Sequence, residues 1–284
     1  MGRQRAVVAS ANLAEHRMTP SFSSFGLRGL PGFSLDPFLN LDDFRMSEPT
    51  FPPHPHAGFS AVTYMFEDAP GAFVNRDSLG DRSRIGPGAL HWTQAGRGML
   101  HEEIPEVRGV VSHGMQMFVK LRAAHEAHEP RAFHVDAADV PEVCFDGLRA
   151  RVLAGALAGV TSPLTELLTP VLLLDVHLAP GARAALPVAE PTCFGLVIAG
   201  SGTVGLGTEA RAHQALGFDR AGDELVLAAG PSGLHLLVAG GAPIGEPVVF
   251  GGPFAMTTRA DVDAAAARYR RGEMGRLEPS DGWR

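Results

Sequence analysis

Two pairs of candidate metal ligands constrain the fold of this chain more than any other feature. His54 and His56 form the segment His-Pro-His, and His101 and Glu103 lie in the segment His-Glu-Glu. Side chains alternate between the two faces of an extended strand, so residues two apart point the same way, roughly 6.5 Å apart. Each pair can therefore offer two ligands to one point. If the two strands face each other across a barrel, three imidazoles and one carboxylate converge on one divalent cation.

Histidine is common in this chain, so the two pairs must be weighed against simpler roles. There are 12 histidines, and an isolated histidine on a strand is more often a hydrogen-bonded core or surface residue than a ligand. Two pairs with the same spacing, both close to glycine-rich turns, are much less easily explained by chance. We expect a single metal site, with five further histidines in supporting or surface positions: His91, His113, His125, His128 and His134.

The many turn-forming residues favour an all-β fold of short strands. The 284 residues include 34 glycines and 22 prolines, which suit tight turns better than long helices. This length is sufficient for two domains of about 100 to 150 residues, each with its own core. Glycine and proline recur between residues 137 and 169. We therefore predict an N-terminal domain at 1–145, which holds the metal, and a C-terminal domain at 146–284.

Charge and cysteine content exclude several classes of partner and compartment. The formal net charge is −7, with no strongly basic run, whereas binding a polyanion requires a clustered cationic face. We expect no direct contact with nucleic acid. Cys144 and Cys193 lie far apart without metal-type spacing, which fits free thiols in a reducing cytoplasm. We expect a cytoplasmic protein that does not enter a membrane, since no segment approaches the roughly 18 apolar residues of a membrane helix.

Local patterns predict a strand beside the first ligand pair and one helix near the C-terminus. Residues 54–67 are rich in Val, Thr, Tyr and Phe and alternate like a strand. Residues 33–44 contain Pro37, which argues against a helix interior; we expect them to cover the mouth of a barrel or to pack outside it. Thr258 followed by Asp261 resembles a capping box. The segment from 260 to 271 is rich in helix formers, and glycine follows as a stop.

An internal comparison suggests that the second half is a degenerate copy of the first. A glycine precedes His101 by 13 residues, and another precedes His235 by the same number. A shift of 134 residues places Leu237 where the first half has Glu103. Val188 and Glu190 then fall where the first half has the His54–His56 pair. One histidine cannot hold a metal, so the comparison predicts no metal in the second half.

Several segments together carry a family likeness. They are LDPFLNLDDF, PHPHAGFSAVTYMFE, RDSLGDRSRIGPGALHWTQAGRGMLHEE, HGMQMFVKL and EPVVFGGPFAMTT. The chain resembles the pirins, members of the cupin superfamily. This resemblance implies two stacked antiparallel jelly-roll barrels with a short C-terminal helix, and a metal, usually iron, in the N-terminal barrel. It assigns the ligands to His54, His56, His101 and Glu103. His91 occupies a position where a glutamine would be expected.

The ligand set and the resemblance together suggest three functions. Three imidazoles and a carboxylate suit Fe(II), Zn, Cu, Ni or Mn, and an octahedral ion would keep two open positions. A pirin-like dioxygenase would use Fe(II) and O₂ to open the ring of a flavonol such as quercetin, with Glu103 as ligand and catalytic base. The alternative is an iron-dependent, redox-sensitive regulatory protein that binds a transcription factor or a metabolic enzyme. A structural zinc site is the third possibility. We expect a monomer.

Overall fold

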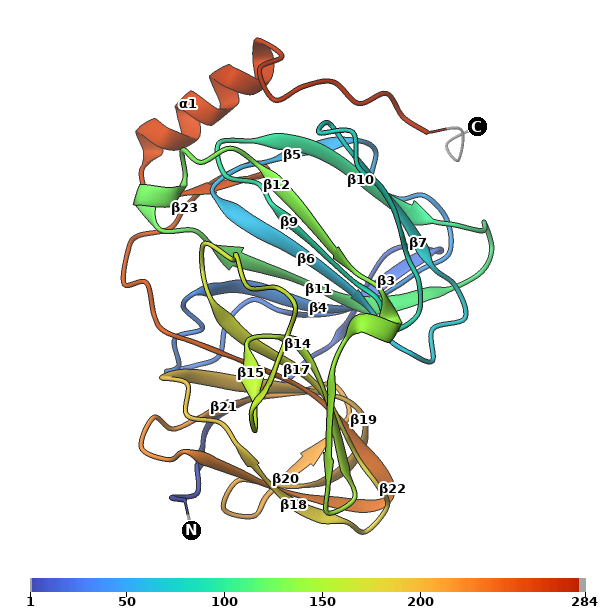
Figure 1. Cartoon of the computed structure of the whole chain (residues 1–284), viewed down its shortest axis with the longest axis vertical. Coiled ribbons are helices and arrows are strands. Elements are labelled where there is room, and N and C mark those ends of the chain that lie inside the picture. The colour runs from blue at the N-terminus through green and yellow to red at the C-terminus, as the bar shows by residue number, and fades with distance from the viewer. Residues whose placement is uncertain (1, 281–284) are drawn as a thin grey trace.

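A computed structural model describes residues 2–280 and shows two β-barrels stacked on each other, with the helix and the C-terminal segment on the first (Figure 1). Every pair of named strands is antiparallel. The predicted all-β cupin fold with two barrels and one helix is confirmed. No helix among residues 2–280 is long and apolar enough to span a membrane.

The first barrel is built from two sheets. Its strands are β2 (Glu15–Thr19), β3 (Phe22–Leu27), β4 (Phe38–Met46), β5 (His54–His56), β6 (Phe59–Met65), β7 (Phe73–Asp77), β8 (Arg82–Ile85), β9 (Leu90–Gln94), β10 (Met99–Pro105), β11 (Ser112–Lys120) and β12 (Arg131–Val135). One sheet has the order β12-β9-β6-β11-β4-β3-β2, and the other has the order β5-β10-β7-β8. Residues 33–44 were expected to cover the barrel mouth or to pack outside the barrel, but from Phe38 onward they form β4, which lies between β11 and β3.

The second barrel is formed mainly by one strongly curved sheet. Its strands are β1 (Val7–Asn12), β13 (Glu142–Phe145), β14 (Leu148–Ala154), β17 (Val171–Leu178), β18 (Arg183–Pro187), β19 (Thr192–Val204), β20 (Thr208–Arg211), β21 (Gln214–Phe218) and β22 (Glu224–Gly241). The remaining elements are the hairpins β15 (Ala156–Leu157) with β16 (Val160–Thr161) and β23 (Val249–Gly251) with β24 (Phe254–Met256), the 3-10 turns Ala123–His125 and Ala137–Asp139, and the helix α1 (Arg259–Arg270).

The two barrels share one hydrophobic core between them. On β6 the side chains of Val62 and Tyr64 point into this shared core, and Leu196 and Leu237 enter it from the second barrel. The opposite face of β6 carries Thr63, which points into the first barrel and bonds there. The seven-stranded sheet therefore separates the shared core from the interior of the first barrel.

The interior of the second barrel is filled by a separate apolar cluster. Val188, Val197, Leu216 and Leu236 are among its fully buried members. Val188 is the residue that the internal comparison placed at the position of His54. Among the described residues of this cluster only the buried thiol of Cys193 could serve as a ligand, and a single thiol does not make a metal site.

The strand pairing corrects the internal comparison. Over residues 234–241, β22 pairs with β17 and β19, just as β11 pairs with β4 and β6 in the first barrel. His235 lies opposite His177 on β17, and His113 lies opposite Arg45 on β4. The structural counterpart of His235 is therefore His113. The predicted equivalence with His101 is wrong, because it rested on a short match of turn residues.

Both chain ends cross between the barrels. The N-terminal strand β1 pairs with β21 of the second barrel, and the buried Arg5 donates hydrogen bonds to the carbonyl oxygens of Val188, Asp219 and Glu190. At the other end β23, β24 and α1 lie against the first barrel (Figure 1). The barrels are thus interlaced, which the proposed division at residue 145 did not anticipate.

The C-terminal helix begins and ends close to where the sequence predicts. Thr258 is the N-cap, and its hydroxyl accepts a hydrogen bond from the backbone N–H of Asp261 at 3.1 Å. Val262 and Ala265 are the buried positions of the helix. They pack with Leu100 and with β24, so the helix closes the outer side of the sheet that carries β5 and β10.

Gly58 breaks the strand that the sequence predicts over residues 54–67. Its φ of +85° belongs to the left-handed region, and the break sends β5 and β6 into different sheets. A Cβ atom at this position would lie 2.1 Å from the carbonyl oxygen of Ala255. Glycine is therefore required here both by the turn and by the close approach of the C-terminal segment.

We expect Gly58→Ala to lower the free energy of unfolding by about 2 kcal/mol or more, because backbone strain adds to a clash with a main-chain atom. Gly80→Ala is the matched control, since Gly80 has a similar φ of +96° but nothing within 4 Å of the added Cβ. Chemical denaturation of both variants measures the difference. Equal losses would mean that the contact with Ala255 contributes nothing.

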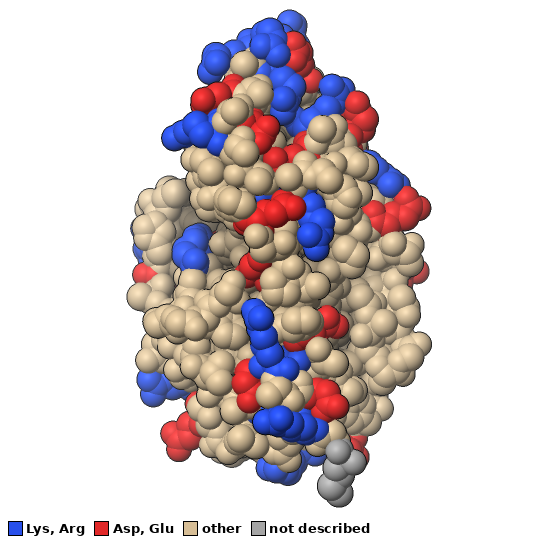
Figure 2. All heavy atoms as spheres, turned by 90° about the vertical axis from the view of Figure 1, so that its left-hand side faces the viewer, with Lys and Arg blue, Asp and Glu red and all other residues tan. Residues whose placement is uncertain are grey.

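Charged side chains are mixed on the molecular surface. On the face shown in Figure 2, Lys and Arg lie among Asp and Glu, and wide neutral areas separate them. This distribution agrees with the modest net charge of −7.

Candidate metal centre

The structure brings His54, His56 and His101 together inside the first barrel. His101 on β10 lies directly opposite His54 on β5, and Met99 lies opposite His56. The three imidazole centroids are 4.7 to 4.8 Å apart, and one ring nitrogen from each lies within 4.8 Å of the others. The two ligand strands are therefore neighbours in one sheet, not partners across the barrel as the sequence analysis supposed.

The hydrogen bonds of the histidine rings direct nitrogen lone pairs toward a common point. His54 Nδ1 lies 2.9 Å from the carbonyl oxygen of Pro52, and His56 Nδ1 lies 3.4 Å from that of Pro253. A carbonyl oxygen can only accept, so each Nδ1 carries the hydrogen and each Nε2 keeps its lone pair. Nε2 of His56 and both nitrogens of His101 are buried without a partner. Buried polar atoms without a protein partner usually bind a water molecule or an ion, and a metal ion fits three ring nitrogens that lie this close together.

Burial keeps these imidazoles in the neutral form that binds metals. Desolvation lowers the pKa of His56 to about 3, with a further contribution from His54. It also lowers the pKa of His54, and it lowers that of His101 well below the usual value. Protons therefore compete weakly with a cation for the three nitrogens.

Glu103 lies in the same cavity but outside the group of three histidines. Thr63 donates a hydrogen bond to its Oε2 at 2.7 Å, and Gln116 donates to the same oxygen at 3.4 Å. Burial raises the pKa of Glu103 to about 7, against the lowering effect of Thr63. A nearby cation would oppose this shift, because an opposite charge favours the carboxylate. Its role as a ligand stays a prediction.

A cavity of about 370 Å³ opens onto the three histidines. Aromatic side chains from four strands and one loop form much of its wall: Phe22, Phe44, Phe51, Phe73 and Phe118. Concave apolar sites of this kind, with a few converging polar groups, are typical of small-molecule binding. The cavity can therefore hold an aromatic molecule against the metal ligands.

Three polar side chains, those of Arg28, Asn40 and Asp42, also line this cavity. Arg28 donates to Oδ1 of Asp42 at 2.9 Å, and Asn40 donates to Oδ2 at 3.1 Å. The Arg28 side chain is 61% exposed, whereas Asp42 is buried, and its desolvation raises the pKa of its carboxyl group. These side chains offer donors and acceptors to the hydroxyl groups of a ligand.

The other histidines named in the sequence analysis lie outside this cavity. His91 is 1% exposed in β9, opposite Thr63, and both its ring nitrogens lack a hydrogen-bond partner. Burial lowers the pKa of His91 to about 4. His113 bonds to Asp43 at 2.8 Å beside the shared core, and His128 is exposed.

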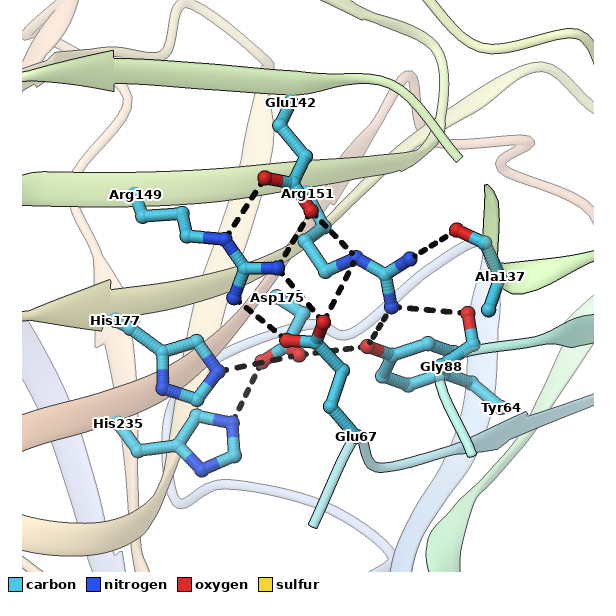
Figure 3. A network of polar contacts seen from close by, with 10 residues as sticks. All are labelled: Tyr64, Glu67, Gly88, Ala137, Glu142, Arg149, Arg151, Asp175, His177 and His235. Atoms are coloured by element: carbon cyan, nitrogen blue, oxygen red, sulfur yellow. Dashed lines mark hydrogen bonds and ion pairs between the residues drawn. The ribbon is translucent and has the colours of Figure 1, made fainter. Parts of the chain in front are cut away.

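A second group of candidate ligands was missed by the sequence analysis. Asp175, His177 and His235 place their ligand atoms within 4.8 Å of one another, where the two barrels meet (Figure 3). Asp175 and His177 are two residues apart on β17, the same spacing that identified the first site. The spacing is visible in the sequence, whereas His235 lies on the distant strand β22 and joins the pair only through the pairing of β17 with β22.

Comparisons with known proteins place the chain in a family. A model described as Pirin matches residues 15–119, and a model described as the pirin C-terminal cupin domain matches residues 173–275. A pirin-like protein of Solanum lycopersicum is 36% identical over 254 residues, which cover 88% of this chain and 85% of that protein. The chain belongs to the pirin family. Pirin of Homo sapiens is 32% identical over 256 residues, covering 88% and 87% of the two chains.

The fold is also similar to the solved structure of an enzyme. Quercetin 2,3-dioxygenase from Acinetobacter baumannii superposes with a TM-score of 0.84 and 27% identity, covering 96% of this chain and 99% of that one. The predicted membership of the pirins is thus confirmed, together with the double-barrel fold. The Pirin match at 15–119 spans all four predicted ligands, from His54 to Glu103.

Proposed function

We propose that this pirin is an iron-dependent dioxygenase that opens the ring of a flavonol such as quercetin with O₂. One observation carries the proposal: three imidazoles, two of them buried, converge at an aromatic-walled cavity of about 370 Å³. The likeness to a quercetin 2,3-dioxygenase supports the choice of substrate. Fold alone does not fix a reaction, so the cavity is the stronger argument.

His54, His56 and His101 would hold the cation, and Glu103 would complete the set. Both hydrogen bonds to Glu103 fall on Oε2, so Oε1 is the oxygen that we assign to the metal. When bound, Fe(II) supplies the redox and Lewis-acid chemistry that O₂ and a deprotonated flavonol require. Imidazole and carboxylate ligands are those of mononuclear iron oxygenases.

The side chains around the cation would bind and orient the substrate. Phe44, Phe73 and Phe118 would pack against the planar ring system and exclude water. The 3-hydroxyl group would point toward Glu103, whose carboxylate accepts its proton. Arg28 and Asn40 would donate hydrogen bonds to hydroxyl groups on the far rings. Thr63 and Gln116 hold the carboxylate of Glu103 in place through Oε2.

Aerobic incubation of the iron-loaded protein with quercetin tests the proposal. We expect loss of the flavonol absorbance, uptake of one O₂ and release of one carbon monoxide per flavonol. The same protein without metal and the His101→Ala variant are the controls. Turnover no higher than in these controls would remove the dioxygenase assignment.

Glu103→Gln separates the role of the carboxylate from that of the histidines. The amide keeps the size of the side chain but loses its charge, so we expect the affinity for iron to fall by about 10-fold or more. Flavonol turnover should fall further than iron occupancy explains, because the amide cannot accept the proton. Competition with a chelator measures the affinity. Unchanged affinity would show that Glu103 is not a ligand.

A further inference from the structure

A cluster of one carboxylate and two imidazoles lies on the face of the second barrel that meets the first (Figure 3). His235 Nε2 lies 2.6 Å from Oδ1 of Asp175, and His177 Nε2 lies 3.4 Å from Oδ2. The two rings stack with centroids 4.0 Å apart. Asp175 is fully buried, whereas the side chain of His177 is 39% exposed. The cluster is therefore rigid at its base and open to solvent on one side.

The carboxylate of Asp175 is held in place by a group outside the cluster. Tyr64 belongs to the first barrel, and its hydroxyl donates a hydrogen bond to Oδ2 of Asp175 at 2.8 Å. Phe66 packs edge-on against the ring of His235, with centroids 5.2 Å apart. Support of this kind fixes the direction of a ligand and is common around metal sites.

The surrounding charges leave this cluster one positive charge short. Arg149 is bound through four hydrogen bonds by Glu67 and Glu142. Arg151 donates to Tyr64 and to two carbonyl oxygens. Three carboxylates, counting Asp175, face two guanidinium groups, so the permanent charges sum to −1. A divalent cation at the neutral imidazoles would offset this charge and leave a net charge of +1.

The first barrel carries the same arrangement with one informative difference. Asp43 on β4 bonds to His113 on β11 at 2.8 Å, as Asp175 bonds to His235. Arg45 stands opposite His113, in the position that His177 holds opposite His235. Its guanidinium lies 3.6 Å from the carboxylate of Asp43. The first barrel thus places a permanent cation where the second places an imidazole with a lone pair.

We propose that Asp175, His177 and His235 form a second metal site, for a divalent transition metal of the Zn²⁺ class. Two imidazoles and one carboxylate are ligands that such ions prefer. The ion replaces the two hydrogen bonds to Asp175, and each ring then carries its hydrogen on Nδ1. Water molecules on the exposed side of His177 complete the coordination. The site lies outside the apolar interior of the second barrel, so it revises the expectation of a single site.

Zinc stoichiometry tests the proposal on the full-length, untagged protein. After stripping with a chelator, the protein is dialysed against buffered Zn²⁺, and bound zinc is counted by mass spectrometry. We expect two equivalents for the wild type, one for each group of ligands. His177→Arg should bind one equivalent, because the variant recreates the arrangement of Arg45 and Asp43. His101→Ala should also bind one, and the double variant none.

The His177→Arg substitution is matched to its site, since the first barrel folds with arginine at the same register position. Should this variant fail to fold by circular dichroism, His177→Gln removes the ligand with little change in volume. One equivalent in the wild type, or two in a folded variant at position 177, would overturn the proposal. Loss of both equivalents in His101→Ala would do the same. None of these outcomes depends on flavonol turnover, so the test is independent of the proposed reaction.

Discussion

His101→Ala protein is expected to lose its iron during dialysis, with an affinity lower by more than about 100-fold. Loss of groups that merely support a ligand costs 10- to 100-fold, and His101 is itself one of the three converging imidazoles. The side chain is 2% exposed, and Ala fills only part of the space that it leaves. The iron content of the dialysed protein, measured by mass spectrometry, gives the result directly.

His128→Ala is the matched control for this experiment. His128 is exposed and does not line the cavity, so its removal should leave the iron content unchanged. Thermal unfolding of both variants shows whether either has lost its fold. If His101→Ala retained iron as well as His128→Ala does, the three histidines would not be the principal ligands.

Arg151→Met is expected to lower the free energy of unfolding by about 3 to 5 kcal/mol, the usual cost of removing one partner from a buried charged network. The Arg151 side chain is 2% exposed. It donates hydrogen bonds at 2.7 to 2.9 Å to the Tyr64 hydroxyl and to the carbonyl oxygens of Gly88 and Ala137 (Figure 3). Met keeps the length of the side chain but leaves these acceptors buried without a donor.

Arg149→Met is the control, since Arg149 lies two residues away on β14 and its side chain is 36% exposed. It binds Glu67 and Glu142, and exposed ion pairs contribute only about 0 to 1 kcal/mol each. Urea denaturation of the two variants should therefore separate them clearly. A similar loss for both would mean that burial of Arg151 adds nothing to the contact between the barrels.

The candidate ligands could be recognised in the sequence because strand periodicity is local. His54 and His56 share a face because they are two residues apart, and the structure brings both rings to His101. The same reasoning applied to Asp175 and His177 would have found the second group. The cap at Thr258 was predictable for the same reason, since Asp261 lies one helical turn away.

Features that depend on distant parts of the chain could not be predicted in this way. The alternation over residues 54–67 places His56 and Tyr64 on one face of a continuous strand. In the structure His56 points into the first barrel and Tyr64 into the shared core, because the chain turns at Gly58. The turn is shaped by Ala255, almost 200 residues later, so no local pattern reveals it.

Short sequence matches misled the internal comparison for a physical reason. A glycine-rich segment followed by Leu-His indicates a turn in the chain, but it does not indicate which strands pair on either side of that turn. The register of the sheets shows that His235 corresponds to His113, and that Arg45 corresponds to His177. Pairing across a sheet is set by contacts between remote strands, which a single sequence does not display.

The interlaced chain ends have a consequence for how the protein is made. Synthesis proceeds from the N-terminus. The strand β1 therefore cannot pair until β21 has been synthesised, and His56 Nδ1 cannot form its hydrogen bond until Pro253 has been synthesised. The outer face of the sheet that carries β5 and β10 therefore stays uncovered until α1 has been synthesised. The proposed iron site is therefore complete only in the full-length polypeptide, and we expect a chain that ends shortly before residue 250 to bind iron more weakly.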